Sequence, residues 1–161
     1  MEYFGVVGTV AVTERRWQDV LAVACGIFNA EDMDKFAPVV LGEIDRLAPA
    51  KISWFNGDDP LAGRARVASR PYIDRVPFLG AWRRWSHQDP VLAYMMNTGD
   101  GSARRLSDFL TGEELHVLEL YTFVYGPLGV EFQVVVGLPA PEASVAGIAR
   151  TFVAESSRPR H

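Results

Sequence analysis

The stretch from His87 to Pro139 constrains the fold more than any other part of the chain, because helix and strand signals follow one another closely within it. Apolar spacing predicts a helix over Pro90–Met96, and the composition of residues 97–101, NTGDG, predicts a turn. Residues 130–138 alternate between two kinds of side chain, as expected for a strand with two different faces. This succession of helix, turn, short strand, helix and strand favours a sheet that lines a pocket.

A capping box opens the second helix of this stretch. The hydroxyl of Thr111 can accept a hydrogen bond from the amide of Glu114 while the Glu114 carboxylate reaches back. We expect the helix to run to about Tyr125 and to stop at Gly126-Pro127. The strand that follows presents one face with Phe132, Val134 and Val136 and another with Glu131, Gln133 and Val135.

The remaining elements are predicted from the same signals. We expect helices over 14–28, 35–47 and 78–85, strands over 51–56, 64–69 and 143–153, and a turn over 57–60. Residues 1–13 are predicted to form an apolar arm or strand, and residues 155–161 a flexible tail. Helices followed by mixed strands and helices indicate a single α+β domain over 1–161 with a mostly antiparallel sheet. The stripe expected to be buried on the first helix is Trp17, Val20, Leu21, Ala24 and Phe28, with Cys25 beside it in the core.

Composition narrows the class of protein. The chain has 161 residues and a formal net charge of −4, which argues against non-specific nucleic-acid binding. No apolar run reaches the roughly 18 residues that a membrane span needs, so we expect no membrane insertion. One cysteine rules out an internal disulfide, and no signal peptide is recognisable at the amino terminus. A cytoplasmic protein is therefore expected.

Aromatic side chains suggest a pocket for a flat ligand. Four tryptophans and five tyrosines in one small domain offer apolar faces with polar edges. The predicted ligand-binding residues are Trp54, Tyr121, Tyr125, Phe132, Gln133 and Arg105, and Arg104 beside Arg105 could also bind a ligand carboxylate.

Glu131 and His87 are the candidate catalytic residues. Glu131 is the only carboxylate in the alternating run 130–138, and neighbouring rings would raise its pKa by removing water. His87 precedes the Asp89-Pro90 turn and is the next candidate. The three histidines do not share a helix face and no cofactor motif is present, so neither a metal nor a cofactor is expected.

Three passages carry a resemblance to a known family: PAKISWFNGDDP (49–60), HQDP (87–90) and the long run from Thr98 to Gln133. Over about Phe36 to Leu138 the chain resembles the GAF-like effector-binding domain that begins actinobacterial LuxR-type transcriptional regulators. The resemblance implies a GAF/PAS-like fold, with a small-molecule pocket between a central sheet and the helices over it. Those regulators continue into a helix-turn-helix, whereas this chain is expected to stand alone and not to bind DNA specifically by itself.

Three functional hypotheses remain open. The first is a receptor for a small, aromatic metabolite. The second is a cofactor-free enzyme of specialised metabolism that uses acid/base catalysis in the same pocket, for example in a Pictet–Spengler-type condensation of an aromatic amine. The third is an interaction protein that forms a homodimer through its apolar arm, because a monomer would have to cover that β-prone segment.

Overall fold

A computed structural model describes residues 13–28, 33–59, 64–138 and 145–152. Almost all of the predicted amino-terminal arm and the whole predicted tail lie outside the described residues. Of the helices in these ranges, none is both long and apolar enough to cross a membrane.

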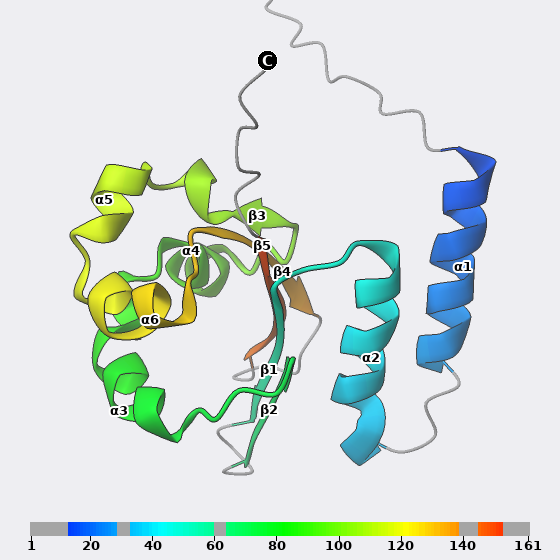
Figure 1. Ribbon diagram of the computed structural model, residues 1–161, viewed down its shortest axis with the longest axis horizontal. Coiled ribbons are helices and arrows are strands. Elements are labelled where there is room, and N and C mark those ends of the chain that lie inside the picture. The colour runs from blue at the N-terminus through cyan, green and yellow to red at the C-terminus, as the bar shows by residue number, and fades with distance from the viewer. Residues whose placement is uncertain (1–12, 29–32, 60–63, 139–144, 153–161) are drawn as a thin grey trace, which may run out of the picture.

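A five-stranded sheet forms the centre of the fold (Figure 1). Its strands are β1 (Ile52–Asp59), β2 (Arg64–Arg70), β3 (Arg104–Arg105), β4 (Phe132–Leu138) and β5 (Val145–Phe152). They lie in the order β2-β1-β5-β4-β3, and every neighbouring pair is antiparallel. The expected α+β class with an antiparallel sheet is therefore confirmed.

Helices cover both faces of this sheet. On one side lie α2 (Met33–Leu47) and, outside it, α1 (Glu14–Phe28). On the other side lie α3 (Val76–Trp85), α4 (Pro90–Thr98), α5 (Gly112–His116) and α6 (Gly126–Leu128), as Figure 1 shows. Three short helical turns, at Ser86–Gln88, Leu106–Asp108 and Tyr121–Tyr125, connect them. The two helical layers have separate cores, so the two faces of the sheet have separate surroundings.

Strand register assigns each side chain to one of these faces. Phe55 pairs with Ile148, and both belong to the core beneath α2. Trp54 pairs with Ala149, which pairs with Val135, and Val135 packs against the core formed by α4, α5 and their connections. We call the first side the α2 face and the second the inner face. Because side chains alternate along a strand, the inner face also carries Gln133, Thr151 and Arg104.

The predicted turn at 57–60 is wrong for the residues that the structure describes. β1 continues through Asp59, which pairs with Arg64 on the neighbouring strand. Gly57 pairs with β2 on one side and β5 on the other, and this double pairing outweighs the turn preference of a Gly-Asp sequence. Pro60 lies outside the described residues.

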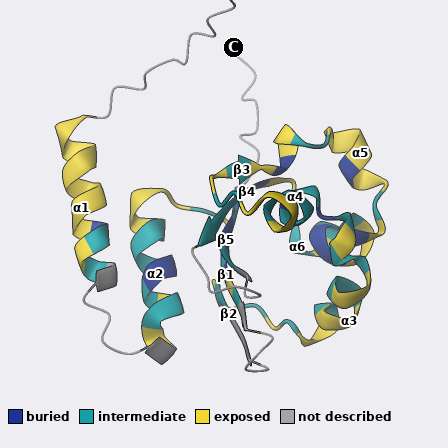
Figure 2. Ribbon diagram, turned by 180° about the vertical axis from the view of Figure 1, so that it is seen from behind, coloured by how far each residue is buried: buried dark blue, intermediate teal, exposed yellow. Residues whose placement is uncertain are grey.

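The first helix has the predicted bounds, but its apolar stripe is not buried. Trp17, Val20 and Leu21 are exposed, and so is Cys25, which was expected in the core. The buried residue of α1 is Val23, on a different side of the helix. Figure 2 shows α1 as an outlying, largely exposed helix. It packs on α2 rather than on the sheet, so only a narrow side of it is covered.

The long helix expected from Thr111 to Tyr125 is interrupted. Its capping box is confirmed, since the Glu114 amide donates to the Thr111 hydroxyl over 3.2 Å and the Glu114 carboxylate accepts from the Thr111 amide over 2.8 Å. However, α5 ends at His116, and the chain resumes as a wide π turn over Tyr121–Tyr125. The break orients Leu120, Val124 and Tyr125 into the core beside Leu115. Burial of these side chains therefore outweighs a continuous helix.

The glycine-rich turn after α4 packs directly on the sheet. Gly99 has a left-handed φ of 69° and ends α4. The amide of Gly137 in β4 donates to the carbonyl of Gly101 over 3.0 Å. A Cβ atom on Gly137 would lie 2.7 Å from the Gly101 Cα, so the two backbones touch where no side chain fits.

Candidate ligand-binding site

The inner face of the sheet holds polar side chains in a buried setting. Gln133 of β4 pairs with Thr151 of β5, which pairs in turn with Ile52 of β1, and all three residues are buried. The next row across the sheet is Arg104, Val135, Ala149 and Trp54. A face that packs only against apolar helices would normally carry apolar residues at these positions. The polar residues therefore need a separate explanation.

Two polar atoms on this face have no hydrogen-bond partner among the described residues. They are Oγ1 of Thr151 and Nε of Arg104, and both atoms are inaccessible to solvent. Buried polar groups in proteins nearly always have a partner, because leaving one unpaired costs about 1–3 kcal/mol. The two atoms belong to strands separated only by β4. Strands two positions apart are about 10 Å apart.

The guanidinium group of Arg104 is held in place by a hydrogen-bond network at the end of α4. Its Nη2 donates to Oδ2 of Asp100 over 2.7 Å and to the hydroxyl of Tyr94 over 2.9 Å, while the Tyr94 hydroxyl donates to the same carboxylate over 2.8 Å. Hydrogen bonds from Ser102, then from Arg104 and Tyr94, hold the pKa of Asp100 well below its usual range. The guanidinium is thus fixed through one edge, and its Nε remains for another acceptor.

Asp89 and Tyr125 form a buried hydrogen bond on the helical side of this space. Oδ1 of Asp89 accepts from the amides of Val91 and Leu92 and caps α4. Its Oδ2 accepts from the Tyr125 hydroxyl over 2.6 Å. Burial, followed by the charge of Asp89, raises the pKa of Tyr125 well above its usual value. Tyr125, predicted to bind ligand, thus lies in the core with its hydroxyl already engaged.

Glu131 contacts two residues from the segment before it. The Tyr121 hydroxyl donates to Oε1 of Glu131, and Nε2 of His116 lies 2.8 Å from Oε2. The His116 and Tyr121 rings are also in contact, with centroids 4.4 Å apart. The hydrogen bond from Tyr121, and then that from His116, lower the pKa of Glu131. This direction is opposite to the expected one, because about two fifths of the side chain remains in water and its partners stabilise the charge.

The other predicted site residues are dispersed. Trp54 lies on the inner face and is half-buried, whereas Phe132 is half-exposed and belongs to the α2 face. Arg105 forms a surface ion pair with Asp108 at 2.8 Å. His87 is exposed, and its ring lies beside that of Trp85.

Sequence reasoning did not single out Thr151 or Asp89. Thr151 lies in a strand that was predicted, two positions from Ala149, and this alternation was an available signal for its burial. Asp89 precedes a proline at the start of a predicted helix, which is a recognisable capping position.

Two hollows described in the structure lie at the β2 end of the sheet. One, of about 190 Å³, is enclosed between β2 and α3 and includes Ser69, the register partner of Trp54. The other, of about 530 Å³, lies between β2 and α2. Neither is lined by Trp54, Tyr121, Tyr125 or Phe132, the aromatic walls expected from the sequence. The smaller hollow borders the inner face at Ser69.

The fold matches that of the ligand-binding domains of LuxR-type regulators. The ligand-binding domain of VqsR from Pseudomonas aeruginosa superposes with a TM-score of 0.60 at 10% identity, over 87% of this chain and 81% of that one. The N-acylhomoserine lactone-dependent LuxR-family factor CepR2 from Burkholderia cenocepacia superposes with a TM-score of 0.50 at 8% identity, over 86% of this chain and 79% of that one. The sequence matches no protein-family model and no curated protein. The LuxR part of the predicted resemblance is thus confirmed at the level of the fold.

Proposed function

We propose that this chain is a small-molecule sensor module that binds its ligand between the inner face of the sheet and the helices α3 to α6. The observation that carries the proposal is the pair of unpartnered buried atoms, Thr151 Oγ1 and Arg104 Nε, on that face. A ligand with an acceptor oxygen for Arg104 and a second polar group for the Thr151 hydroxyl, which can donate or accept, would satisfy both. The similarity of the fold to LuxR-type ligand-binding domains supports the same function.

The proposed ligand is a flat aromatic metabolite of about two rings that carries a carbonyl or carboxylate oxygen. Arg104 Nε can only donate, so the ligand must present an acceptor to it. Trp54 lies on the same row of the sheet and offers an apolar ring face. CepR2 is described as dependent on an N-acylhomoserine lactone, which also carries carbonyl acceptors but has a flexible acyl chain. The flat ring of Trp54 favours a rigid, planar ligand over such a chain.

A binding experiment with two probes tests this proposal. Indole-3-carboxamide represents a planar, uncharged carbonyl ligand, and N-hexanoyl-homoserine lactone represents the acyl-lactone class. We expect the carboxamide to bind in calorimetry, and Thr151→Val to weaken it about 5- to 30-fold through the lost hydrogen bond. Thr151→Val should not lower stability, because it removes an unpaired polar atom.

Thr122→Val is the matched control, since Thr122 is exposed on the π turn. It should leave binding unchanged. Equal binding of the carboxamide by the original chain, Thr151→Val and Thr122→Val would overturn the site. Binding of the lactone alone, with loss in Thr151→Val, would keep the site and overturn the aromatic ligand.

The enzyme hypothesis keeps one specific observation in its favour. Tyr121, His116 and Glu131 form a hydrogen-bonded cluster of three proton-transferring groups. A cofactor-free condensation of an aromatic amine would need only such a proton relay beside a shaped cavity. The contacts of the described residues join His87 to Trp85 and not to this cluster, so Glu131 remains the candidate acid or base.

The exposed apolar residues of α1 and the net charge of the chain support proposals about its partners. Exposed Trp17 and Leu21 on α1 present an apolar stripe that a second copy of the chain would cover, so we propose a homodimer. Light scattering should give twice the monomer mass, and Leu21→Lys should reduce it. The chain is acidic, with a pI of about 5.4, so we propose that it does not bind duplex DNA specifically by itself. We also propose a cytoplasmic location, which the single cysteine favours.

A further inference from the structure

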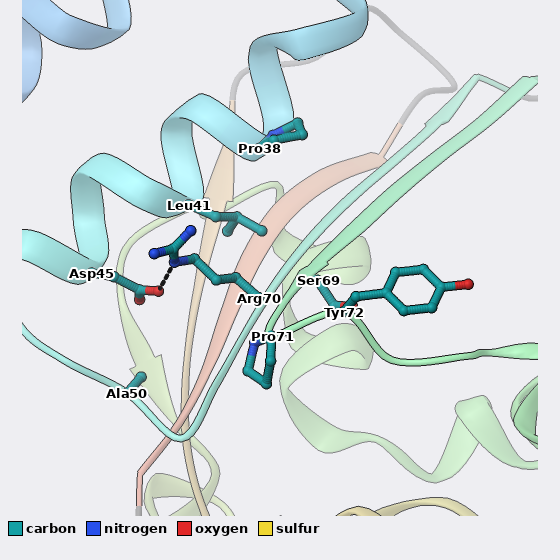
Figure 3. A pocket seen from close by; sticks show the side chains of 8 residues that line it. All are labelled: Pro38, Leu41, Asp45, Ala50, Ser69, Arg70, Pro71 and Tyr72. Atoms are coloured by element: carbon teal, nitrogen blue, oxygen red, sulfur yellow. Dashed lines mark ion pairs between the residues drawn. The ribbon is translucent and has the colours of Figure 1, made fainter.

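The larger hollow lies on the α2 face, between α2 and the edge strand β2 (Figure 3). Its volume of about 530 Å³ is within the range of small-molecule sites. The side chains that line it come from α2, from the end of β2 and from the segments beside them. They are Pro38, Leu41, Asp45, Ala50, Ser69, Arg70, Pro71 and Tyr72.

One side of the hollow is apolar. Leu41 is almost fully buried and faces the sheet, while Pro38 and Pro71 lie across the opening from each other (Figure 3). Tyr72 stands at the rim with 85% of its surface exposed, so its ring has no packing partner to fix it inside the fold. These side chains suit the body of a compact apolar molecule.

The polar side of the hollow, formed by Asp45 and Arg70, is part of a cluster that extends to Arg150 of β5 and has an excess of positive charge. Asp45 is shared by two arginines, because Arg150 Nη2 lies 2.9 Å from its Oδ1 and Arg70 Nε lies 3.1 Å from its Oδ2. The hydroxyl of Ser53 also donates to Oδ1, over 2.7 Å. One carboxylate therefore faces two guanidinium groups, and the cluster has a formal charge of +1. An additional anion would balance it.

Arg70 is the group that can bind this anion. Arg150 is nearly buried and also donates to the Ala48 carbonyl, whereas the side chain of Arg70 is 61% exposed. Only Nε of Arg70 has a recorded partner among the described residues. Its Nη1 approaches α2 at Gly42, where an added Cβ would be 4.0 Å away. The absence of a side chain at Gly42 leaves space beside the terminal nitrogens.

The charged groups of this hollow lie on the face of the sheet opposite to the inner face, although Ser69 and Tyr72 at its edge also line the smaller hollow. Arg70 pairs with Ser53, which pairs with Arg150, and all three lie on the α2 face. Thr151 and Trp54 lie on the opposite side of the same strands. A molecule bound to Arg70 in this hollow would thus contact a different face of the sheet from one bound to Thr151 and Trp54.

We propose that the hollow between α2 and β2 is a second ligand site, which takes a small organic carboxylate with a compact apolar body. The carboxylate binds the terminal nitrogens of Arg70, and the apolar body lies against Leu41, Pro38 and Pro71 with Tyr72 at the rim.

A pair of probes that differ only in charge tests this site on the whole chain. Benzoate carries the carboxylate, and benzamide has the same shape without the charge. We expect benzoate to shift the backbone NMR signals of Leu41 and Gly42 and to bind about tenfold or more tightly than benzamide. Arg70→Ala should abolish this preference, and Arg70→Lys should weaken it because a lysine lacks the planar fork.

Arg46→Ala is the matched control. Arg46 is an exposed arginine of α2, and its side chain pairs with Glu43 at 2.8 Å. It should bind benzoate like the original chain, and so should Thr151→Val, which tests only the inner face. Circular dichroism establishes that each variant is folded, and Arg70→Lys keeps the charge beside Asp45 if Arg70→Ala does not fold. Equal affinity for benzoate and benzamide would overturn the proposal. The proposal would also be overturned if Arg70→Lys bound benzoate as tightly as the original chain and benzoate shifted the NMR signals of Trp54 and Thr151 instead of that of Gly42.

Discussion

The Tyr125 hydroxyl donates to Oδ2 of Asp89 over 2.6 Å, and both side chains are buried although 36 positions separate them in the sequence. Because Oδ1 of the same carboxylate caps α4, this contact joins the π turn to the first turn of that helix. It places α4 over the inner face of the sheet. The proposed ligand space therefore depends on a hydrogen bond inside the helical layer.

Replacing Tyr125 by phenylalanine should destabilise the protein. The change removes the donor and leaves a buried carboxylate oxygen unpaired, which costs about 1–3 kcal/mol. Urea denaturation followed by circular dichroism measures the free energy of unfolding. Tyr72→Phe, at an exposed position, is the control and should change it by less than about 0.5 kcal/mol. Equal stability of the two variants would contradict the structural role of the contact.

Two glycine-to-alanine changes should act in opposite directions. In Gly137→Ala the new Cβ would lie 2.7 Å from the Gly101 Cα, so the turn must move away from β4 and stability should fall by about 1–3 kcal/mol. In Gly80→Ala the new Cβ meets nothing within 4 Å on helix α3, so stability should rise by about 0.4–1 kcal/mol. Thermal unfolding compares the two. A Gly137→Ala variant as stable as the original chain would show that the two backbones do not touch.

Acid should weaken the fold partly through Asp100. The pKa of Asp100 is lowered in the folded state from an ordinary value of 3.8, so its ionised form contributes stability above that pH. This contribution is lost as the pH falls below about 4 toward the folded-state pKa. Asp100→Asn should therefore show a smaller loss of stability between pH 7 and pH 3 than the original chain. Asp19→Asn, an exposed carboxylate on α1, is the control, and an unaltered acid response in Asp100→Asn would count against the network.

Glu131→Gln distinguishes the receptor from the enzyme. Glutamine keeps the size of the side chain but cannot act as the base or acid in the cluster with Tyr121 and His116. If the chain is an enzyme that condenses an aromatic amine with an aldehyde, Glu131→Gln should lower turnover about 10²- to 10⁴-fold, as expected for the loss of a positioned proton-transfer group. If the chain only binds a ligand through Glu131, affinity should fall by about 1–3 kcal/mol.

The control for Glu131→Gln is Glu113→Gln, at an exposed position of α5. Mass spectrometry detects the condensation product, and calorimetry measures affinity. Because about half of the His116 side chain and about two fifths of the Glu131 side chain are in water, their ion pair should contribute less than about 1 kcal/mol to stability. If the Glu131→Gln variant has unchanged turnover and unchanged affinity, Glu131 has no role in either hypothesis.

Local signals in the sequence predicted most elements and their order. The bounds of α1 agree with the prediction, and the Thr111–Glu114 capping box is present. The alternation in 130–138 predicted β4 to within two residues. These features depend on hydrogen bonds and side-chain periodicity within a few residues, so neighbouring positions suffice to indicate them.

The site could be predicted only in part. Glu131 and Tyr121 were singled out, and they are in contact, but His116 rather than His87 joins them. Trp54 and Gln133 do share the inner face, whereas Phe132 lies on the other side of the sheet. Which side of β4 meets which helical layer depends on its pairing with β5 and on the positions of α2 and α4, which lie far away in the sequence.

The sequence by itself determined the α+β class and the succession of helices and strands, because periodicity, capping and glycine placement act over short distances. Only the tertiary structure decided that Thr151 and Arg104 present unpaired atoms to one buried face, and that Asp45 is shared between Arg70 and Arg150. Those relationships arise from strand register and from the packing of distant elements. Burial then sets which polar groups lose water, and therefore which of them need a partner.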